Sequence, residues 1–402
     1  EFDWLDFGLQ HRTRWNYRVD DYQRNPATGD DNQFLLRSLG YIGIREILDP
    51  IRFGFEFQDS RQFNSILPPN NQDTDEADII QAFVELYFPD VFGKGDPFRF
   101  QVGRFTMDYA DRKLVARNGW RNTTSFDGFR IQLGDWTSDW QFDVFAVQPV
   151  ERFLHKFNHG DEERWFFGIE GAWRKWKDYI VIEPYYLILA EQRDDPRVND
   201  REIHTIGFHA FGPILKTGFD YDVAFNYQFG HDGDLRHRAF ATHGEIGYTF
   251  DHPWKPRLSF YNQYATGDRN PNDNLNERFD RLFNAAHPFS TSDFFNWQNI
   301  IVNKLRLDLR PSDKLRFDIA YGGYWLASDS DAWVTPRRRD PRGRSGDFVG
   351  QEIEMLLRYQ LDPRVEIEMG YSHFMPGPFV RNTGTSEDSD FFYVQTTFSL
   401  YK

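Results

Sequence analysis

The chain has 402 residues, of which 18% are aromatic, and its mean hydropathy is -0.69. Cysteine is absent, which excludes disulfides, thiol catalysis and thiolate metal sites. The formal net charge of -15 argues against a nucleic-acid-binding protein, because a phosphate backbone selects a basic surface. No run of 18 apolar residues occurs, so we predict no transmembrane helix.

Segments in which apolar and polar residues alternate recur along the whole chain. The first of them places Phe7 and Leu9 on one face of a strand and Arg12 and Arg14 on the other. The clearest, 219–229, alternates for 11 residues, about the length that crosses a bilayer at a tilt. In chain order, the predicted strands cover 7–19, 34–47, 51–58, 80–86, 98–102, 128–136, 140–148, 164–175, 179–190, 202–211, 219–229, 239–250, 257–265, 304–310, 315–321, 352–359, 364–369 and 392–400. About 18 such strands predict an all-β fold, a transmembrane antiparallel β-barrel.

The connections between these segments alternate between short and long. Short ones such as 48–50, 311–314 and 361–363 carry the Asp, Pro and Ser of tight turns. The long ones cover 20–33, 59–77, 106–127, 149–163, 191–201, 230–238, 266–299, 326–350 and 376–390. Short periplasmic turns and long extracellular loops are typical of outer-membrane barrels, so we predict one barrel domain over 1–402 in the bacterial outer membrane. A soluble propeller or stacked sandwich would need repeats at blade spacing, which are not seen.

Charged side chains on the polar face of the predicted strands, which would point inward, are candidates for lining the pore. A barrel this wide holds water, a loop plug or both. They are Arg12, Arg14, Arg52, Arg99, Arg130, Arg306, Arg316, Glu352, Glu366 and Glu368. A band of arginines would draw a polyanion such as a uronate polymer, since guanidinium matches carboxylate geometry. Alternatively, these residues form ordinary ion pairs with neighbouring carboxylates along the inner wall of the barrel. The acidic members predict a pore of mixed sign.

Five stretches together resemble a known family. Residues 99–122 read RFQVGRFTMDYADRKLVARNGWRN, 126–130 read FDGFR, 264–283 read YATGDRNPNDNLNERFDRLF, 350–361 read GQEIEMLLRYQL, and 374–379 read FMPGPF. In combination they resemble the alginate export family of outer-membrane barrels. The resemblance implies an 18-stranded monomeric pore whose arginine-rich constriction passes an anionic exopolysaccharide. Arg99 and Arg104 lie in the segment that is similar to the arginine-bearing segment of the family.

Two features depart from the family pattern. The strand before FMPG reads RVEIEMGYSHF, with Glu366 and Glu368 where the alginate exporter has lumen arginines. The long periplasmic plug loop of the exporter has no counterpart, since every periplasmic connection predicted here is short. Members of such a family would differ in cargo and in direction of transport.

One loop is a candidate calcium site. Asp268, Asn270 and Asn272 place oxygen atoms at alternate positions, and Ca²⁺ takes such oxygens, so they are candidate ligands of a structural calcium ion in loop 266–299. A run of Asx turns that cap their own backbone is the commoner explanation of such a sequence, and no other cofactor is expected. The histidines form no HExxH motif, and those at 204, 209 and 243 are expected in the lumen or the aromatic girdle rather than as metal ligands.

These patterns predict an outer-membrane channel of the alginate-export type for passive passage of a polar, anionic polysaccharide or oligosaccharide, without catalysis. The alternative is a loop-plugged structural or binding barrel within a cell-surface complex. The expected partners are outer-membrane lipid or lipopolysaccharide, the saccharide cargo, and a periplasmic or surface protein. No nucleic acid is expected, and the barrel is expected to be monomeric.

Overall fold

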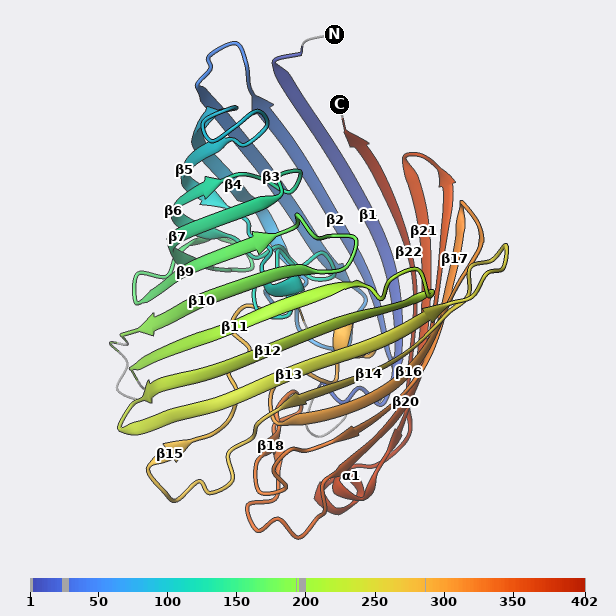
Figure 1. Ribbon diagram of the computed structural model, residues 1–402. Helices are drawn as coiled ribbons and strands as arrows, with labels where there is room; N and C mark the ends of the chain where they lie inside the picture. The colour runs from blue at the N-terminus through green and yellow to red at the C-terminus, as the bar shows by residue number, and fades with distance from the viewer. Residues whose placement is uncertain (1–2, 24–28, 193, 195–199, 286, 402) are drawn as a thin grey trace.

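The structure is a computed structural model that describes residues 3–23, 29–192, 194, 200–285 and 287–401. Within these residues, 18 long strands run antiparallel around one sheet (Figure 1). They are β1 (Leu5–Val19), β2 (Asp31–Ile44), β3 (Ile51–Phe63), β4 (Asp75–Phe88), β5 (Phe98–Phe105), β6 (Phe126–Leu133), β7 (Trp140–Glu151), β9 (Arg164–Trp173), β10 (Val181–Glu191), β11 (Arg201–Pro213), β12 (Phe219–Asp232), β13 (Leu235–Thr249), β14 (Arg257–Ala265), β16 (Ile300–Ser312), β17 (Leu315–Trp325), β20 (Phe348–Asp362), β21 (Val365–Pro376) and β22 (Ser389–Tyr401). β1 pairs with both β2 and β22, so the sheet closes and the predicted barrel is confirmed.

Short elements lie in the connections between the barrel strands. They are β8 (His159–Gly160), β15 (Leu275–Asn276), β18 (Ala332–Trp333), β19 (Arg338–Arg339), the 3-10 turns η1 (Ala110–Arg112) and η2 (His287–Phe289), and the helix α1 (Pro378–Thr383). Among the described residues, no helix is both long enough and apolar enough to cross a membrane.

The outer surface of the barrel is an apolar belt built by the alternation of the strands. Phe53 in β3 is 39% exposed and Phe225 in β12 is 40% exposed, whereas Ala224, the residue that precedes Phe225, is buried inside. The same outward exposure is seen at Phe129 and Leu305 on other strands. Large exposed apolar side chains that ring a sheet need a lipid environment, which is the arrangement of an outer-membrane barrel.

Both termini lie at one end of the barrel, where the connections are short, and most long loops lie at the other (Figure 1). The prediction of a long loop at 230–238 is wrong. β12 continues to Asp232 and pairs there with Leu235, the first residue of β13. Gly233 adopts a φ of 58° in the turn and donates its N–H to the Asp200 carbonyl at 2.7 Å. The polar residues of this segment extend the strand ladder, because a two-residue turn with glycine at positive φ suffices to reverse the chain.

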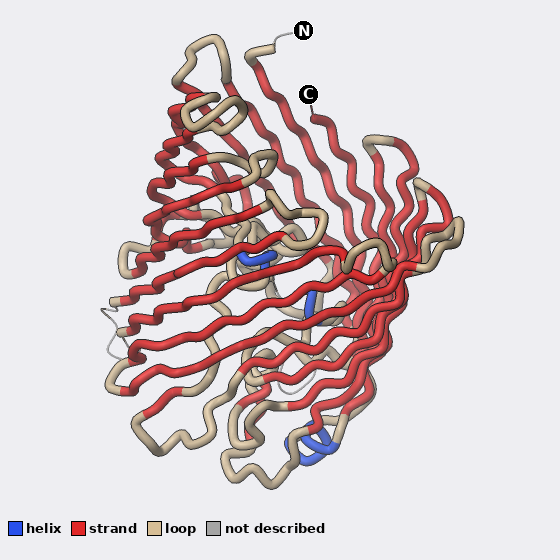
Figure 2. The backbone as a smooth tube through the Cα atoms, viewed as in Figure 1, coloured by secondary structure: helices blue, strands red, loops and turns tan. Residues whose placement is uncertain are grey.

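Loop 106–125, between β5 and β6, folds into the barrel instead of outward. Its middle residues Leu114, Val115 and Ala116 are fully buried. They meet loop 266–299 through two main-chain hydrogen bonds, Phe283 N–H to Leu114 O at 2.9 Å and Ala116 N–H to Phe283 O at 3.0 Å. In Figure 2, short helical turns are seen inside the ring of strands. One of them, η1, contacts β11 of the barrel wall. The lumen therefore contains ordered chain.

An aromatic cluster fills part of the lumen near the end opposite the termini. Trp297 and Phe295 of loop 266–299 are buried, as is Trp333 of the connection between β17 and β20. The ring of Phe295 stacks on Tyr324 of the wall with a centroid distance of 3.8 Å. Phe374 of β21 lies 5.9 Å from the Trp333 ring. Loops from the long-loop end are thus held inside the barrel by apolar packing.

Candidate functional site

Loop 106–125 spans the lumen from one wall to the other. On one side, the Tyr109 hydroxyl donates to Asp143 of β7 at 2.9 Å and its ring stacks on Phe145 at 5.3 Å. On the other side, Arg12 and Arg14 of β1 donate to the main-chain oxygens of the segment 119–120, at 2.5 and 3.1 Å. The loop therefore separates two spaces of opposite character, which are described in turn.

The first space is a cavity of about 620 Å³, the arginine cavity. Its charged lining consists of Arg12, Arg37, Arg117, Glu56 and Glu366. Arg117 forms an ion pair with Glu56 at 2.6 Å. Arg12 and Arg37 are 6% and 5% exposed and, among the described residues, have no carboxylate within 4.0 Å. Their guanidinium groups bond instead to the neutral oxygens of Gly119, Arg121 and Gln10.

The second space is a cavity of about 630 Å³, the carboxylate cavity. It is lined by Asp111, Glu170, Glu183, His209, Asp222 and Arg130, among others. Here Arg130 is paired with Asp143 at 2.5 Å, so one arginine of the lining is already neutralised. The two cavities therefore offer surplus positive charge on one side of loop 106–125 and carboxylates on the other.

Trp120 fixes the loop against the β1 wall. The Arg14 guanidinium lies over its ring at 3.7 Å, and the His287 ring stacks on it at 3.8 Å with an interplanar angle of 7°. The indole N–H donates to Asp293 at 2.9 Å. Stacking between a buried guanidinium and an indole stabilises such a contact by about 2 kcal/mol.

Arg121 joins three loops. It forms ion pairs with Asp73 of the β3–β4 loop at 2.5 Å and with Asp293 of loop 266–299 at 3.0 Å. Burial alone would raise the pKa of Asp73, but Arg121 and Arg14 outweigh it and hold that pKa below its ordinary value. Burial likewise opposes ionisation of Asp293, yet Arg121 and His287 lower its pKa. Both carboxylates are therefore charged at neutral pH, and loop 106–125 is held by a charged network.

Comparison with known proteins adds the family and the fold. The sequence profile of the family described as Alginate export matches residues 3–394 of the chain. The chain belongs to the alginate export family. The resemblance inferred from the motifs is thereby confirmed.

Solved structures of Pseudomonas aeruginosa proteins are similar to this family member. OpdQ matches with a TM-score of 0.66 and 13% identity over 100% of both chains. OpdK, crystallised with vanillate, matches with a TM-score of 0.66 and 10% identity over 99% of both chains. The outer membrane protein OprD matches with a TM-score of 0.62 and 12% identity, covering 100% of this chain and 95% of its own.

These likenesses show the fold, and no curated protein sequence matches the chain. Family and fold together identify this alginate export family member as a channel of the bacterial outer membrane.

Among the described residues, five of the ten predicted pore-lining residues form ion pairs of 3.4 Å or shorter. The pairs are Arg52 with Asp49 (3.0 Å), Arg99 with Asp135 (3.4 Å), Arg130 with Asp143 (2.5 Å), Arg306 with Asp308 (2.8 Å) and Glu368 with Arg358 (2.7 Å). For these five residues the geometry favours ion pairing within the barrel wall over binding of a solute. Pairing supplies each charge with its partner, which leaves little attraction for an ion in transit.

The other five lie in different places. Arg12 and Glu366 line the arginine cavity, and Arg14 is stacked on Trp120 beside it. Arg316 is exposed and shares a third cavity of about 440 Å³ with Arg306 and other charged residues near the periplasmic end. Glu352 is fully buried beneath loop 266–299, where it accepts hydrogen bonds from the Ser290 hydroxyl at 2.6 Å and the Ser292 N–H at 3.2 Å. Glu352 points inward as predicted, but loop 266–299 covers it.

The predicted calcium ligands take part in hydrogen bonds to backbone N–H groups. The Asn270 side chain caps the N–H of Asn272 at 3.2 Å, and the Asp268 N–H bonds to Asp331 at 2.9 Å. Burial, with the nearby Asp331, raises the pKa of Asp268. The Asn270 contact is that of an Asx turn, whereas the Asp268 contact joins two loops, and the calcium site stays a prediction.

Several residues of the arginine cavity and of loop 106–125 were not among the predicted pore-lining residues. Arg37 lies on the inner face of β2 between Leu35 and Leu39, so alternation placed no polar stripe there. Trp120 and Arg121 belong to a long loop, for which strand parity predicts nothing. The only signal was the RNGWRN sequence itself, whose concentration of arginine beside tryptophan in a loop is unusual for a solvent-exposed turn.

Proposed function

We propose that this outer-membrane channel passes an anionic saccharide through the arginine cavity. The observation that carries the proposal is the pair Arg12 and Arg37, buried cations whose hydrogen-bond partners are neutral oxygens. A carboxylate arriving there would gain charge-assisted hydrogen bonds, and guanidinium binds it in a planar, two-point geometry.

The remainder of the arginine cavity suits a sugar. Gln10, Tyr41, Gln81 and Thr397 present amide and hydroxyl groups along its lining. Sugar hydroxyls exchange hydrogen bonds with such groups, while the carboxylate of a uronic acid would occupy the cationic end. The similar structure of OpdK was crystallised with vanillate, a small organic carboxylate, which is consistent with anion passage in this fold.

The second candidate function is a loop-plugged barrel that acts as a binding or structural component of a cell-surface complex. The aromatic cluster of Trp297, Phe295 and Trp333 favours it, because loops packed to this extent do not leave the lumen without cost. An open channel conducts ions in a planar bilayer and a plugged barrel does not, so conductance separates the two functions.

The selectivity of the purified channel tests the proposal. Under a salt gradient in a planar bilayer, we expect the wild type to prefer anions. The double variant Arg12→Glu/Arg37→Glu should reverse the sign of the reversal potential, since it replaces two unpaired cations by two anions. Arg342→Glu/Arg344→Glu is the matched control, because it makes the same charge change at exposed loop positions and should leave the reversal potential within a few millivolts. A cation-selective wild type, or equal effects of the two double variants, would contradict the proposal.

A further inference from the structure

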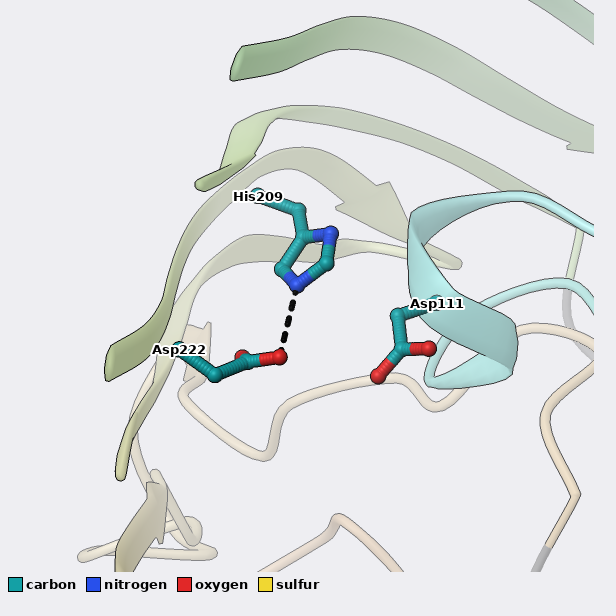
Figure 3. Close-up of side chains that lie close together, drawn as sticks. All are labelled: Asp111, His209 and Asp222. Carbon is teal, nitrogen blue, oxygen red and sulfur yellow. Dashed lines mark hydrogen bonds and ion pairs between the residues drawn. The ribbon is translucent and has the colours of Figure 1, made fainter. Parts of the chain in front are cut away.

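Three side chains meet in the carboxylate cavity at metal-binding distances. Asp111 comes from η1 in loop 106–125, His209 from β11 and Asp222 from β12 (Figure 3). One ligand atom of each lies within 4.8 Å of the others. His209 is almost fully buried, whereas the carboxylate of Asp111 is exposed to the cavity.

We propose that Asp111, His209 and Asp222 form a binding site for a divalent transition-metal ion, for which Zn²⁺ is the probe. One imidazole and two carboxylates are a donor set that suits zinc and its neighbours. The His209 Nε2 lies 3.0 Å from an Asp222 oxygen. Two ligands of a tetrahedral zinc ion are about 3.4 Å apart, so a small displacement would admit the ion between them.

The surroundings of His209 resemble those of a metal ligand. Its second ring nitrogen, Nδ1, lies 3.0 Å from the Glu183 carboxylate of β10. Metal-ligating histidines usually donate their other N–H to such a carboxylate, which fixes the ring and its tautomer. Asp222 is held in turn by His243 Nε2 of β13 at 3.3 Å. Ala224 pairs with both His209 and His243, so a methyl group stands where a larger side chain would fill the space between the two imidazoles.

Lys113 shows that a cation is accommodated at this cluster. Its ammonium group forms an ion pair with Asp111 and lies 3.7 Å from Asp222. A metal ion bound by the same two carboxylates has to displace this ammonium, because like charges repel strongly at such distances. Removal of the ammonium should therefore strengthen metal binding.

The histidine also determines which ions are selected. Imidazole nitrogen binds zinc, copper and nickel well, whereas Ca²⁺ and Mg²⁺ prefer oxygen ligands. The proposed site is therefore distinct from the candidate calcium ligands of loop 266–299. It is also independent of the proposed anion path, since it lies on the opposite side of loop 106–125.

The experiment is a calorimetric titration of Zn²⁺ into the purified, chelator-treated full-length barrel in detergent. We expect one ion per chain. His209→Gln should weaken binding by more than about 100-fold and Glu183→Gln by about 10-fold or more, as outer-shell changes do. Lys113→Met should tighten binding. Glu366→Gln, a carboxylate of the arginine cavity, is the matched control and should leave the affinity unchanged.

Several outcomes would overturn the site: no stoichiometric Zn²⁺ binding by the wild type, equal affinity for Ca²⁺, full affinity in a folded His209→Gln variant, or weaker binding in Lys113→Met. Folding of each variant is verified by the heat-dependent shift of the barrel on a gel. If His209→Gln does not fold, the Lys113→Met and Glu183→Gln titrations decide, because these changes leave the strand ladder intact. X-ray absorption at the zinc edge should show one nitrogen ligand from imidazole.

Discussion

Arg14 is a buried guanidinium whose partners are the Trp120 ring, the Trp120 carbonyl at 3.1 Å and the Asp73 carboxylate at 3.9 Å. The planar group can stack and donate at once, whereas an ammonium cannot. A buried charge with few direct carboxylate contacts depends on such additional interactions, because burial removes its hydration.

Substitution of Arg14 by lysine tests the contribution of the stack. Arg14→Lys keeps the charge and loses the planar contact, so we expect the free energy of unfolding to fall by about 1–2 kcal/mol. The measurement is denaturant unfolding of the barrel in phospholipid vesicles, followed by tryptophan fluorescence. Arg316→Lys, at an exposed position near the periplasmic end, is the control and should change little. Equal losses in both variants would contradict a specific role of the stack.

The alternation of apolar and polar residues correctly placed Arg14 and Glu352 on the inner face of the barrel, but it did not predict what surrounds them. Both residues are buried because loops lie over them, Trp120 over Arg14 and the segment 290–292 over Glu352. Which loop covers which wall residue depends on contacts between segments at least 60 residues apart. Strand periodicity contains no information about those contacts. The same reason explains why Arg37 and Arg121 were missed.

At the scale of elements, the strands follow from the sequence and the loops do not. Every predicted strand is found, because a period of two over a bilayer-length segment is a strong signal. The predicted strand ends were wrong where a strand continues beyond the apolar belt with polar residues, as at 230–238. The inward fold of loop 106–125 has no periodic signature. It depends on Arg121, Asp73 and Asp293, which join three loops.

This network predicts a dependence on pH. The pKa values of Asp73 and Asp293 are lowered in the folded barrel, so their contribution to stability is present above the ordinary aspartate pKa of about 4. It is lost as the pH falls through the lowered values. We therefore expect single-channel conductance to stay constant from pH 7 to about 4 and to rise or become noisy only at lower pH, as the two carboxylates are protonated and the loops are released.

Amide variants separate this effect from general acid damage. Asp73→Asn/Asp293→Asn removes both charges and should give the acid-type conductance already at pH 7. Asp340→Asn is the control: hydrogen bonds from the Ser345 hydroxyl and nearby backbone N–H groups lower the pKa of Asp340 as well, but its partners lie within its own loop. Identical traces for the double variant and the wild type at pH 7 would show that the network does not hold loop 106–125 in the lumen.

At the scale of the whole molecule, the barrel separates three environments. Lipid faces the apolar belt, the arginine cavity offers positive charge, and the carboxylate cavity offers negative charge across the same loop. Net charge does not describe such a molecule, because opposite signs are kept apart by loop 106–125. A solute that crosses the lumen therefore meets a local field that the overall value of -15 does not represent.

The apolar belt predicts where charge is not tolerated. Phe225 lies near the middle of β12 and faces outward, so Phe225→Arg should lower the free energy of unfolding in phospholipid vesicles by about 2–4 kcal/mol, as for arginine near the bilayer midplane. Phe157→Arg makes the same change at a side chain that is 68% exposed in a loop outside the strands, and should cost less than about 1 kcal/mol. The measurement is guanidinium unfolding monitored by tryptophan fluorescence. Equal costs at the two positions would mean that the outward face of β12 does not contact hydrocarbon, and the membrane-spanning arrangement would then be wrong.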